Sequence, residues 1–177
     1  MTAKNRNGWG AGSALNTDTS GLKVSTVPTA VVLSANMSAS NDTAVTISWN
    51  ALITADLSNG GADVITYEVY WNAGIFASSF TLLTGSVSTP LITSSYTQDS
   101  GISAGNDYTF KVRAVNQFGE GSFSNLVSVR AASAPGTISA VGFILDSTSI
   151  RISWNIPNNH GATIRNYTIL FKNAEAS

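Results

Sequence analysis

The 177-residue chain contains no cysteine and a single histidine, His160. The absence of cysteine excludes disulfides, thiolate nucleophiles and cysteine-ligated zinc, and one histidine excludes any site that needs two imidazoles. Charged residues make up 11% of the chain, against about 25% in ordinary soluble proteins, and the formal net charge is −1. The chain therefore lacks the basic face that a phosphate backbone requires, and we expect no nucleic-acid partner.

Long apolar runs and catalytic motifs are missing as well. No uninterrupted apolar run approaches about 18 residues, so we expect no membrane insertion within this segment. The carboxylates are scattered and no Gly-x-Ser-x-Gly elbow surrounds a serine. We therefore expect no catalytic, metal or cofactor-binding residues, no cofactor, and no enzyme activity. His160 lies in the polar turn of residues 158–161, where a lone histidine is typically solvated.

The chain is rich in Ser and Thr, and its apolar residues recur at every second position in several short segments. In residues 43–49 the side chains of Val45, Ile47 and Trp49 alternate with those of smaller or polar residues. This alternation is typical of half-buried strands, and no long segment has the helical period. Similar alternation occurs in residues 67–71, 108–112, 126–129 and 150–154, with turn-forming residues at 58–61, 104–107, 119–121 and 158–161. Many short strands separated by turns predict an antiparallel sandwich or barrel.

An internal repeat organises the chain. The sequence ISWN of residues 47–50 recurs at 152–155, and the Gly-Ala pair at 61–62, followed by Tyr67, recurs at 161–162, followed by Tyr167. Residues 3–10 parallel residues 114–121. The period is roughly 105 residues, so the chain holds one whole unit and parts of two others.

The order of these residues resembles a fibronectin type III domain. The resemblance rests on Pro28, on Trp49, on Tyr67-x-Val69-x-Trp71, and on Ile102-x-x-Gly105-x-x-Tyr108 followed by TFKVRAVN and Gly119-x-Gly121. It implies an all-β, antiparallel, two-sheet immunoglobulin-like sandwich, with strands A-B-E packed on C′-C-F-G. It also implies that the Tyr108 hydroxyl bonds back to the E–F turn. We expect five aromatic residues to form the structural core of the repeated units, namely Trp49, Tyr67, Tyr108, Trp154 and Tyr167.

The repeat gives the expected boundaries. Residues 1–23 are the C-terminal end of a preceding domain (the end of strand F, and strand G), residues 24–132 are one complete domain, and residues 133–177 are strands A to C of a following domain. The Pro-stopped linker of residues 131–136 is short, so neighbouring units should have restricted relative motion. We expect the chain to be a window from a longer tandem array, the alternative being a poorly trimmed fragment.

Candidate surface sites are few. Three sequons make Asn36, Asn41 and Asn166 candidate N-glycosylation sites. Phe118, in the F–G loop, and Trp9, at the matching loop of the preceding unit, are candidate interface residues. The Arg-Gly-Asp motif known in this family is absent from the F–G loop, so that adhesion activity is not carried over.

The sequence favours a non-enzymatic structural or adhesive spacer in a long extracellular or cell-surface protein, in a fibre or coat. The expected partners are neighbouring fibronectin type III domains of the same or adjacent chains, and other proteins. Two alternatives stay open: an ancillary module of a secreted carbohydrate-active enzyme, and part of an intracellular giant scaffold protein.

Overall fold

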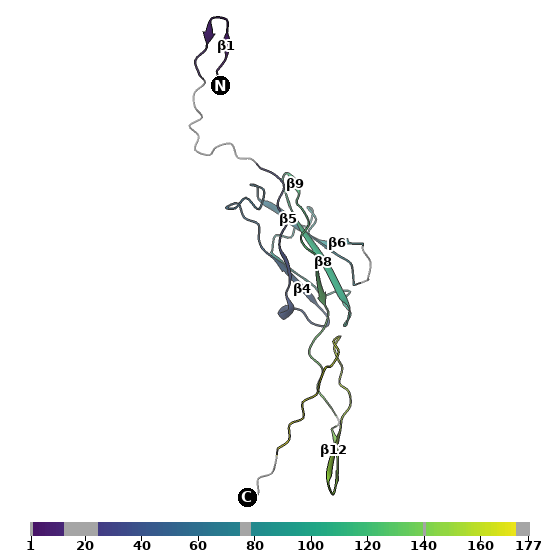
Figure 1. Ribbon diagram of the computed structural model, residues 1–177. Helices are drawn as coiled ribbons and strands as arrows, with labels where there is room; N and C mark the ends of the chain where they lie inside the picture. Colours follow the sequence, from purple (N-terminus) through teal and green to yellow (C-terminus); the bar gives the residue numbers. More distant parts are fainter. Residues whose placement is uncertain (1, 13–24, 75–78, 140, 173–177) are drawn as a thin grey trace.

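A computed structural model describes residues 2–12, 25–74, 79–139 and 141–172. Residues 25–132, here called the central domain, form two packed antiparallel sheets (Figure 1). One sheet has the order β3-β4-β7, and the other has the order β10-β8-β5-β6 with β9 paired to β8. The strands are β3 (Leu33–Ala35), β4 (Val45–Trp49), β5 (Val64–Trp71), β6 (Thr81–Thr84), β7 (Ser95–Gln98), β8 (Asp107–Asn116), β9 (Gly119–Glu120) and β10 (Val127–Arg130).

This topology confirms the predicted sandwich, with A-B-E on one side and C′-C-F-G on the other. The described residues contain no α-helix, and a single 3₁₀ turn, η1 (Met37–Ala39), joins β3 to β4. Asn36 begins that turn, and its side-chain oxygen accepts a hydrogen bond from the Ala39 amide. No helix in the described part of the chain is long and apolar enough to cross a membrane.

The core lies between the two sheets and follows from the alternation of the strands. Val45, Ile47 and Trp49 point inward from β4 and are at most 6% exposed. They meet inward side chains of β5, β8 and β10, among which Phe110 is fully buried. Burying each such side chain contributes about 1.5–3 kcal/mol, so this face supplies most of the stability of the domain.

Tyr108, near the start of β8, lies at the end of the core from which the chain continues into residues 133–172. Its ring is buried and stacks on Trp71, with ring centroids 5.8 Å apart. Its hydroxyl accepts a hydrogen bond from the Ser103 amide at 2.7 Å and donates one to the Gly101 carbonyl at 3.2 Å. The phenol therefore bonds back to the turn before β8, as the resemblance implies.

Two asparagine side chains join segments that are far apart in the sequence. Asn125 accepts a hydrogen bond from the Leu33 amide and donates one to the Leu33 carbonyl, both at 3.0 Å, so it links β3 to the segment before β10. Asn116, which is buried, donates to the carbonyls of Thr26 at 2.7 Å and Asn59 at 2.9 Å. The Asn116 side chain thus ties the first residues of the domain to the loop before β5.

Residues 2–12, here called the N-terminal segment, form a hairpin with the register of β8 and β9. In β1 (Lys4–Asn5) and β2 (Gly8–Trp9), Asn5 pairs with Gly8, as Asn116 pairs with Gly119. The positive φ angles of the two glycines agree, at 129° and 127°, a conformation in which glycine has no Cβ penalty. The expected strand G of the preceding unit and the boundary at Val24 lie outside the described residues.

Residues 133–172, here called the C-terminal segment, continue from the lower end of the central domain (Figure 1). Their hairpin consists of β11 (Gly142–Asp146) and β12 (Ser149–Ser153). Strand C, expected as the last strand of residues 133–177, is not formed, because residues 163–172 contain no strand. A strand needs a hydrogen-bonded neighbour, and no neighbour pairs with this stretch within the described residues.

Candidate functional site

The structure brings together three of the five expected core aromatics. Trp49, Tyr67 and Tyr108 are at most 6% exposed, and the rings of Trp49 and Tyr67 lie 5.5 Å apart at an angle of 58°. The Tyr67 hydroxyl also accepts a hydrogen bond from the Leu52 amide at 3.1 Å. These side chains hold the fold and are not available to a ligand.

Trp154 and Tyr167 make the same pair in the C-terminal segment without being fully buried. Their ring centroids are 5.2 Å apart at 56°, close to the geometry of Trp49 and Tyr67. Tyr167 is nevertheless 38% exposed, and Trp154 is only partly buried. The expectation of core burial is wrong for this pair, because no second sheet among the described residues covers their face.

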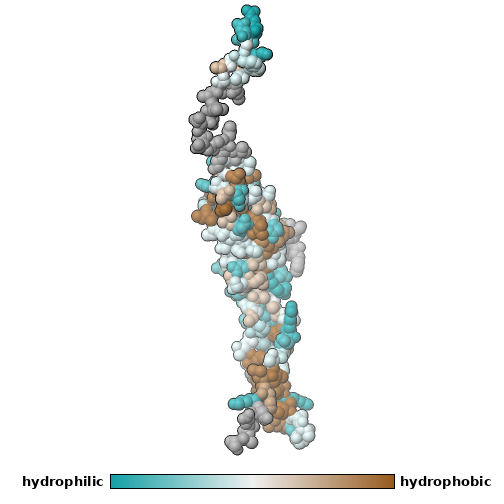
Figure 2. All heavy atoms as spheres, turned by 60° about the vertical axis from the view of Figure 1, so that its left-hand side comes forward, coloured by the Kyte–Doolittle hydropathy of each residue, from teal (hydrophilic) through white to brown (hydrophobic). Residues whose placement is uncertain are grey.

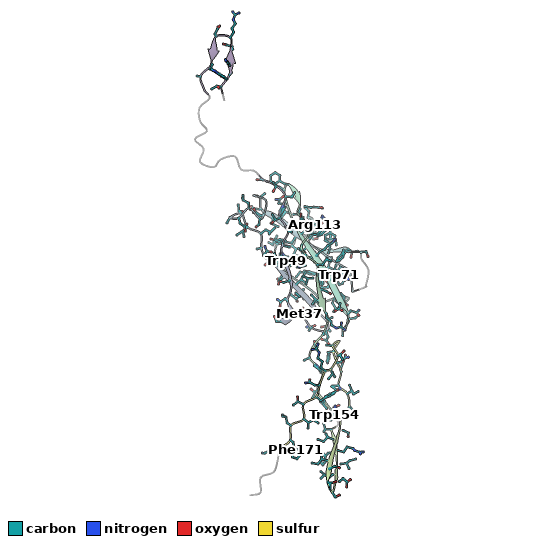
Figure 3. All side chains as sticks on the ribbon, viewed as in Figure 1. Met37, Trp49, Trp71, Arg113, Trp154 and Phe171 are labelled. Atoms are coloured by element: carbon teal, nitrogen blue, oxygen red, sulfur yellow. The ribbon has the colours of Figure 1, made fainter. Side chains whose placement is uncertain are left out.

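Apolar surface gathers on the C-terminal segment, where β11 and β12 lie (Figure 2). The pair of Trp154 and Tyr167 lines an apolar hollow of about 150 Å³. Ile150, which stands in β12 where Val45 stands in β4, is 50% exposed whereas Val45 is 1% exposed. Phe171 points away from the rest of the chain near its lower end (Figure 3) and is 71% exposed.

Within the described residues, no group of three or more His, Asp or Glu side chains is arranged to hold a metal ion. His160 is not simply solvated, contrary to the expectation. Its Nδ1 lies 2.6 Å from Oδ2 of Asp42, and its side chain is 32% exposed. This contact could not be predicted from the sequence, because the two residues are 118 positions apart and only the fold brings them together.

A cluster of aromatic and basic side chains covers the outer face of the β10-β8-β5-β6 sheet. Lys111 Nζ lies 4.0 Å from the ring centroid of Phe123 and 4.8 Å from that of Phe80. The Arg113 guanidinium lies 4.8 Å from Phe123 and 5.4 Å from Tyr70. Such cation–π contacts each contribute about 0.5–1 kcal/mol at exposed positions, so the cluster stiffens the sheet face.

Two glutamates form ion pairs with Arg113. Glu68 stands directly opposite Arg113 on the neighbouring strand, and its Oε2 accepts a hydrogen bond from Arg113 Nε at 2.8 Å. Glu120 pairs with the same guanidinium from β9. Burial disfavours the charge of Arg113, but the hydrogen bond and charge of Glu68 outweigh it and raise the pKa of Arg113.

Tyr70 belongs to the same cluster, and its pKa is raised mainly by burial and further by Glu68. Its hydroxyl donates to Glu68 Oε2 at 3.1 Å and accepts from Arg113 Nη2 at 3.1 Å. No motif in the sequence predicts this network. The outward positions of Glu68, Tyr70 and Arg113 in alternating strands were the available signal, but only the strand register shows that they touch.

The remaining candidate residues lie at the surface. Phe118 is 49% exposed in the turn between β8 and β9, and Trp9 is 68% exposed in the N-terminal segment, with Lys4 Nζ 5.3 Å from its ring. Asn41 and Asn166 are exposed, whereas Asn36 is partly buried. The Asn41 side-chain oxygen accepts hydrogen bonds from the amides of Thr43 and Ala44, each at 2.8 Å.

Comparison with known proteins places the central domain in a family. The family model described as "Fibronectin type III domain" matches residues 28–130, more than half of the chain. No curated protein matches the chain.

Similar solved structures include an Fn3-like protein from Clostridium thermocellum (21% identity, covering 62% of this chain and 96% of that one, TM-score 0.41). Others are a fourth FNIII domain of human (17% identity, 72% and 96%, TM-score 0.46) and domains of titin (21% identity, 62% and 33%, TM-score 0.44). The family match agrees with the sheet order and with the hydrogen bond between the Tyr108 hydroxyl and the turn before β8. The chain therefore belongs to the fibronectin type III family.

Proposed function

We propose that the chain is a structural and adhesive spacer in a long, multi-domain extracellular or cell-surface protein. In this proposal residues 1–23 and 133–177 belong to neighbouring fibronectin type III units, and the central domain is one link of the array. Its role is geometric: a folded sandwich sets a distance between its two ends and presents loops and sheet faces to other proteins.

The repetition of local structure is the observation that carries the proposal. The N-terminal segment has the register of β8 and β9, and the C-terminal segment repeats the antiparallel pairing of β3 with β4 and the Trp–Tyr pair. Pieces of the same unit on both sides of a complete one are what a tandem array contains.

The apolar face of the C-terminal segment supports the same proposal. Val141, next to β11, and Phe143 and Ile150, within β11 and β12, are between 50% and 71% exposed, although Val45 at the position matching Ile150 is buried. Strands with such faces require a second sheet to become stable. In the proposed array that sheet is the remainder of the following unit.

The adhesive part of the proposal rests on the exposed groups of the central domain. Phe118 projects from a turn, and the cluster of Lys111, Arg113 and Phe123 covers a sheet face. Aromatic and arginine side chains are enriched in interface hot spots. Asn36, Asn41 and Asn166 are proposed as glycosylation sites of this surface.

The test is to recover the native protein from its source with an antibody against the central domain. We expect a mass far above 18.4 kDa, removal of the epitope from intact cells by added protease, and a mass decrease after glycosidase treatment. An intact mass near 18.4 kDa would refute the array. Protection from protease in intact cells would instead favour an intracellular scaffold, and a hydrolase domain in the same chain would favour an enzyme module.

A further inference from the structure

The lower end of the central domain carries a loop of the C-terminal segment. This loop, residues 158–161, is here called the docking loop. His160 Nδ1 lies 2.6 Å from Asp42 Oδ2, and Arg130 Nε donates a hydrogen bond to the Gly161 carbonyl at 3.0 Å. Asp42 lies between η1 and β4 and Arg130 ends β10, so both sheets of the central domain hold the docking loop.

The linker joins the same network. Ser133 Oγ donates a hydrogen bond to Asp42 Oδ1 at 2.8 Å and accepts one from the Asp42 amide at 3.0 Å. The Ser133 amide donates to the His160 carbonyl at 2.9 Å. Asp42, Ser133 and His160 thus form a closed set of contacts between the central domain, the linker and the docking loop.

Backbone packing at this junction leaves no room for a side chain. Gly161 has φ of 85°, and a Cβ at this position would lie 2.4 Å from the Gly105 amide nitrogen and 2.5 Å from the Ala131 carbonyl oxygen. Real Cβ atoms essentially never approach so closely. The docking loop therefore fits against the turn before β8 as backbone against backbone, like a packed interior.

The central domain contains a loop of the same build at its opposite end. Gly61 has φ of 73°, close to that of Gly161, and the incoming chain forms the same two backbone bonds to each loop. In the central domain the Thr26 amide donates to the Gly60 carbonyl at 2.8 Å, and the Thr29 amide donates to the Ser58 carbonyl at 2.9 Å. In the C-terminal segment the Ser133 amide donates to the His160 carbonyl at 2.9 Å, and the Gly136 amide donates to the Asn158 carbonyl at 2.8 Å.

The two loops differ at two positions, where Ser58 corresponds to Asn158 and Gly60 corresponds to His160. The repeat aligns His160 with Gly60, so the central domain's loop has no imidazole at the position from which His160 reaches Asp42. Both loops thus share their backbone bonds to the incoming chain, whereas the docking loop alone carries an imidazole.

We propose that the lower end of the central domain is a docking surface for the equivalent loop of the next repeat unit, and that this contact makes the junction a fixed joint. Gly161 supplies the close approach and the His160–Asp42 pair selects this particular neighbour. The inference deepens the proposed spacer function, because fixed joints determine the length and direction of an array.

The hydrogen bonds of Asp42 at the joint favour its ionised form. The hydrogen bond from His160, helped by Ser133, holds the pKa of Asp42 below its ordinary value. Arg130 lies nearby but is paired with Asp107 at 3.1 Å. Because the folded pKa of Asp42 is lowered, its contribution is present above the ordinary carboxyl range and is lost as the pH falls through the lowered value.

The test measures relative motion in the full chain by NMR residual dipolar couplings and amide relaxation. For the wild type we expect one alignment tensor to fit both the central domain and the C-terminal segment. The Gly161→Ala variant should give two independent tensors. The control is Gly136→Ala in the same segment, where a Cβ would meet neighbours only at 3.6 Å or more and the wild-type result should persist.

A second measurement tests the charged contact. The carboxyl carbon resonance of Asp42 is titrated in the wild type and in His160→Asn, a substitution that tolerates the positive φ of 44° at this position. We expect the pKa of Asp42 to rise toward 3.8, while the pKa of Asp56, lowered by its own bonds to Ser58, stays unchanged.

Two tensors in the wild type, or one shared tensor in Gly161→Ala, would overturn the fixed joint. An unchanged Asp42 pKa in His160→Asn would overturn the selective role of the pair. These outcomes are separate from the mass and location of the native protein, so the joint and the spacer function stand or fall independently.

Discussion

The Tyr108 hydroxyl gives the sharpest test of how the central domain is held together. Tyr108→Phe removes one oxygen and keeps the buried ring that stacks on Trp71. The lost oxygen accepts from the Ser103 amide and donates to the Gly101 carbonyl. At about 1 kcal/mol for each hydrogen bond, the free energy of unfolding should fall by about 2 kcal/mol.

This loss corresponds to a decrease in Tm of about 10 °C for a domain of this size. The assay is urea and thermal unfolding followed by circular dichroism. The control is Tyr96→Phe, whose hydroxyl donates one hydrogen bond to the Gln98 side chain and whose loss should cost about 1 kcal/mol. If Tyr108→Phe costs no more than the control, the hydroxyl does not secure the turn and the reasoning is refuted.

Three further predictions concern the core, a glycine and the charged cluster. Ile47→Ala, at a fully buried side chain, should lower the free energy of unfolding by about 3 kcal/mol in urea titrations; a loss below about 1 kcal/mol would contradict the assigned core. Gly85→Ala should cost at least about 2 kcal/mol by the same assay, because φ is 86° and a Cβ would collide with the Tyr67 carbonyl oxygen; near-neutral stability would disprove this close approach. Since burial and then Glu68 raise the pKa of Tyr70, its stabilising effect is present below the ordinary tyrosine range and is lost as the pH rises through the raised value. Glu68→Gln should move the pKa of Tyr70 back toward 10.0 in an ultraviolet titration, and an unmoved value would show that Glu68 has no influence.

The sandwich could be predicted because its determinants are local. Alternation in residues 43–49 placed Val45, Ile47 and Trp49 inward, and each of them is buried. The turn spacing and the family pattern then gave the order of the strands. The repeat also located the N-terminal hairpin, since one register explains residues 3–10 and residues 114–121.

The contacts between distant residues could not be predicted in this way. The alternation showed that Glu68 and Arg113 point outward, but their pairing depends on the register of β5 against β8. The contact between His160 and Asp42 depends on how one unit meets the next, which no period in the sequence encodes. The prediction that Trp154 and Tyr167 are buried is wrong for a different reason. The sheet that would cover such a pair is not among the described residues.

The Asn125 bridge has a consequence for a chain under tension. The polypeptide enters the central domain at one end and leaves at the other (Figure 1), so a pull on its neighbours drags β3 and β10 lengthwise past each other. Asn125 grips both backbone groups of Leu33 across that boundary. Both of these bonds and the ladder between β3 and β4 oppose removal of the first strand, so a single amide side chain adds to the resistance of the domain to stretching.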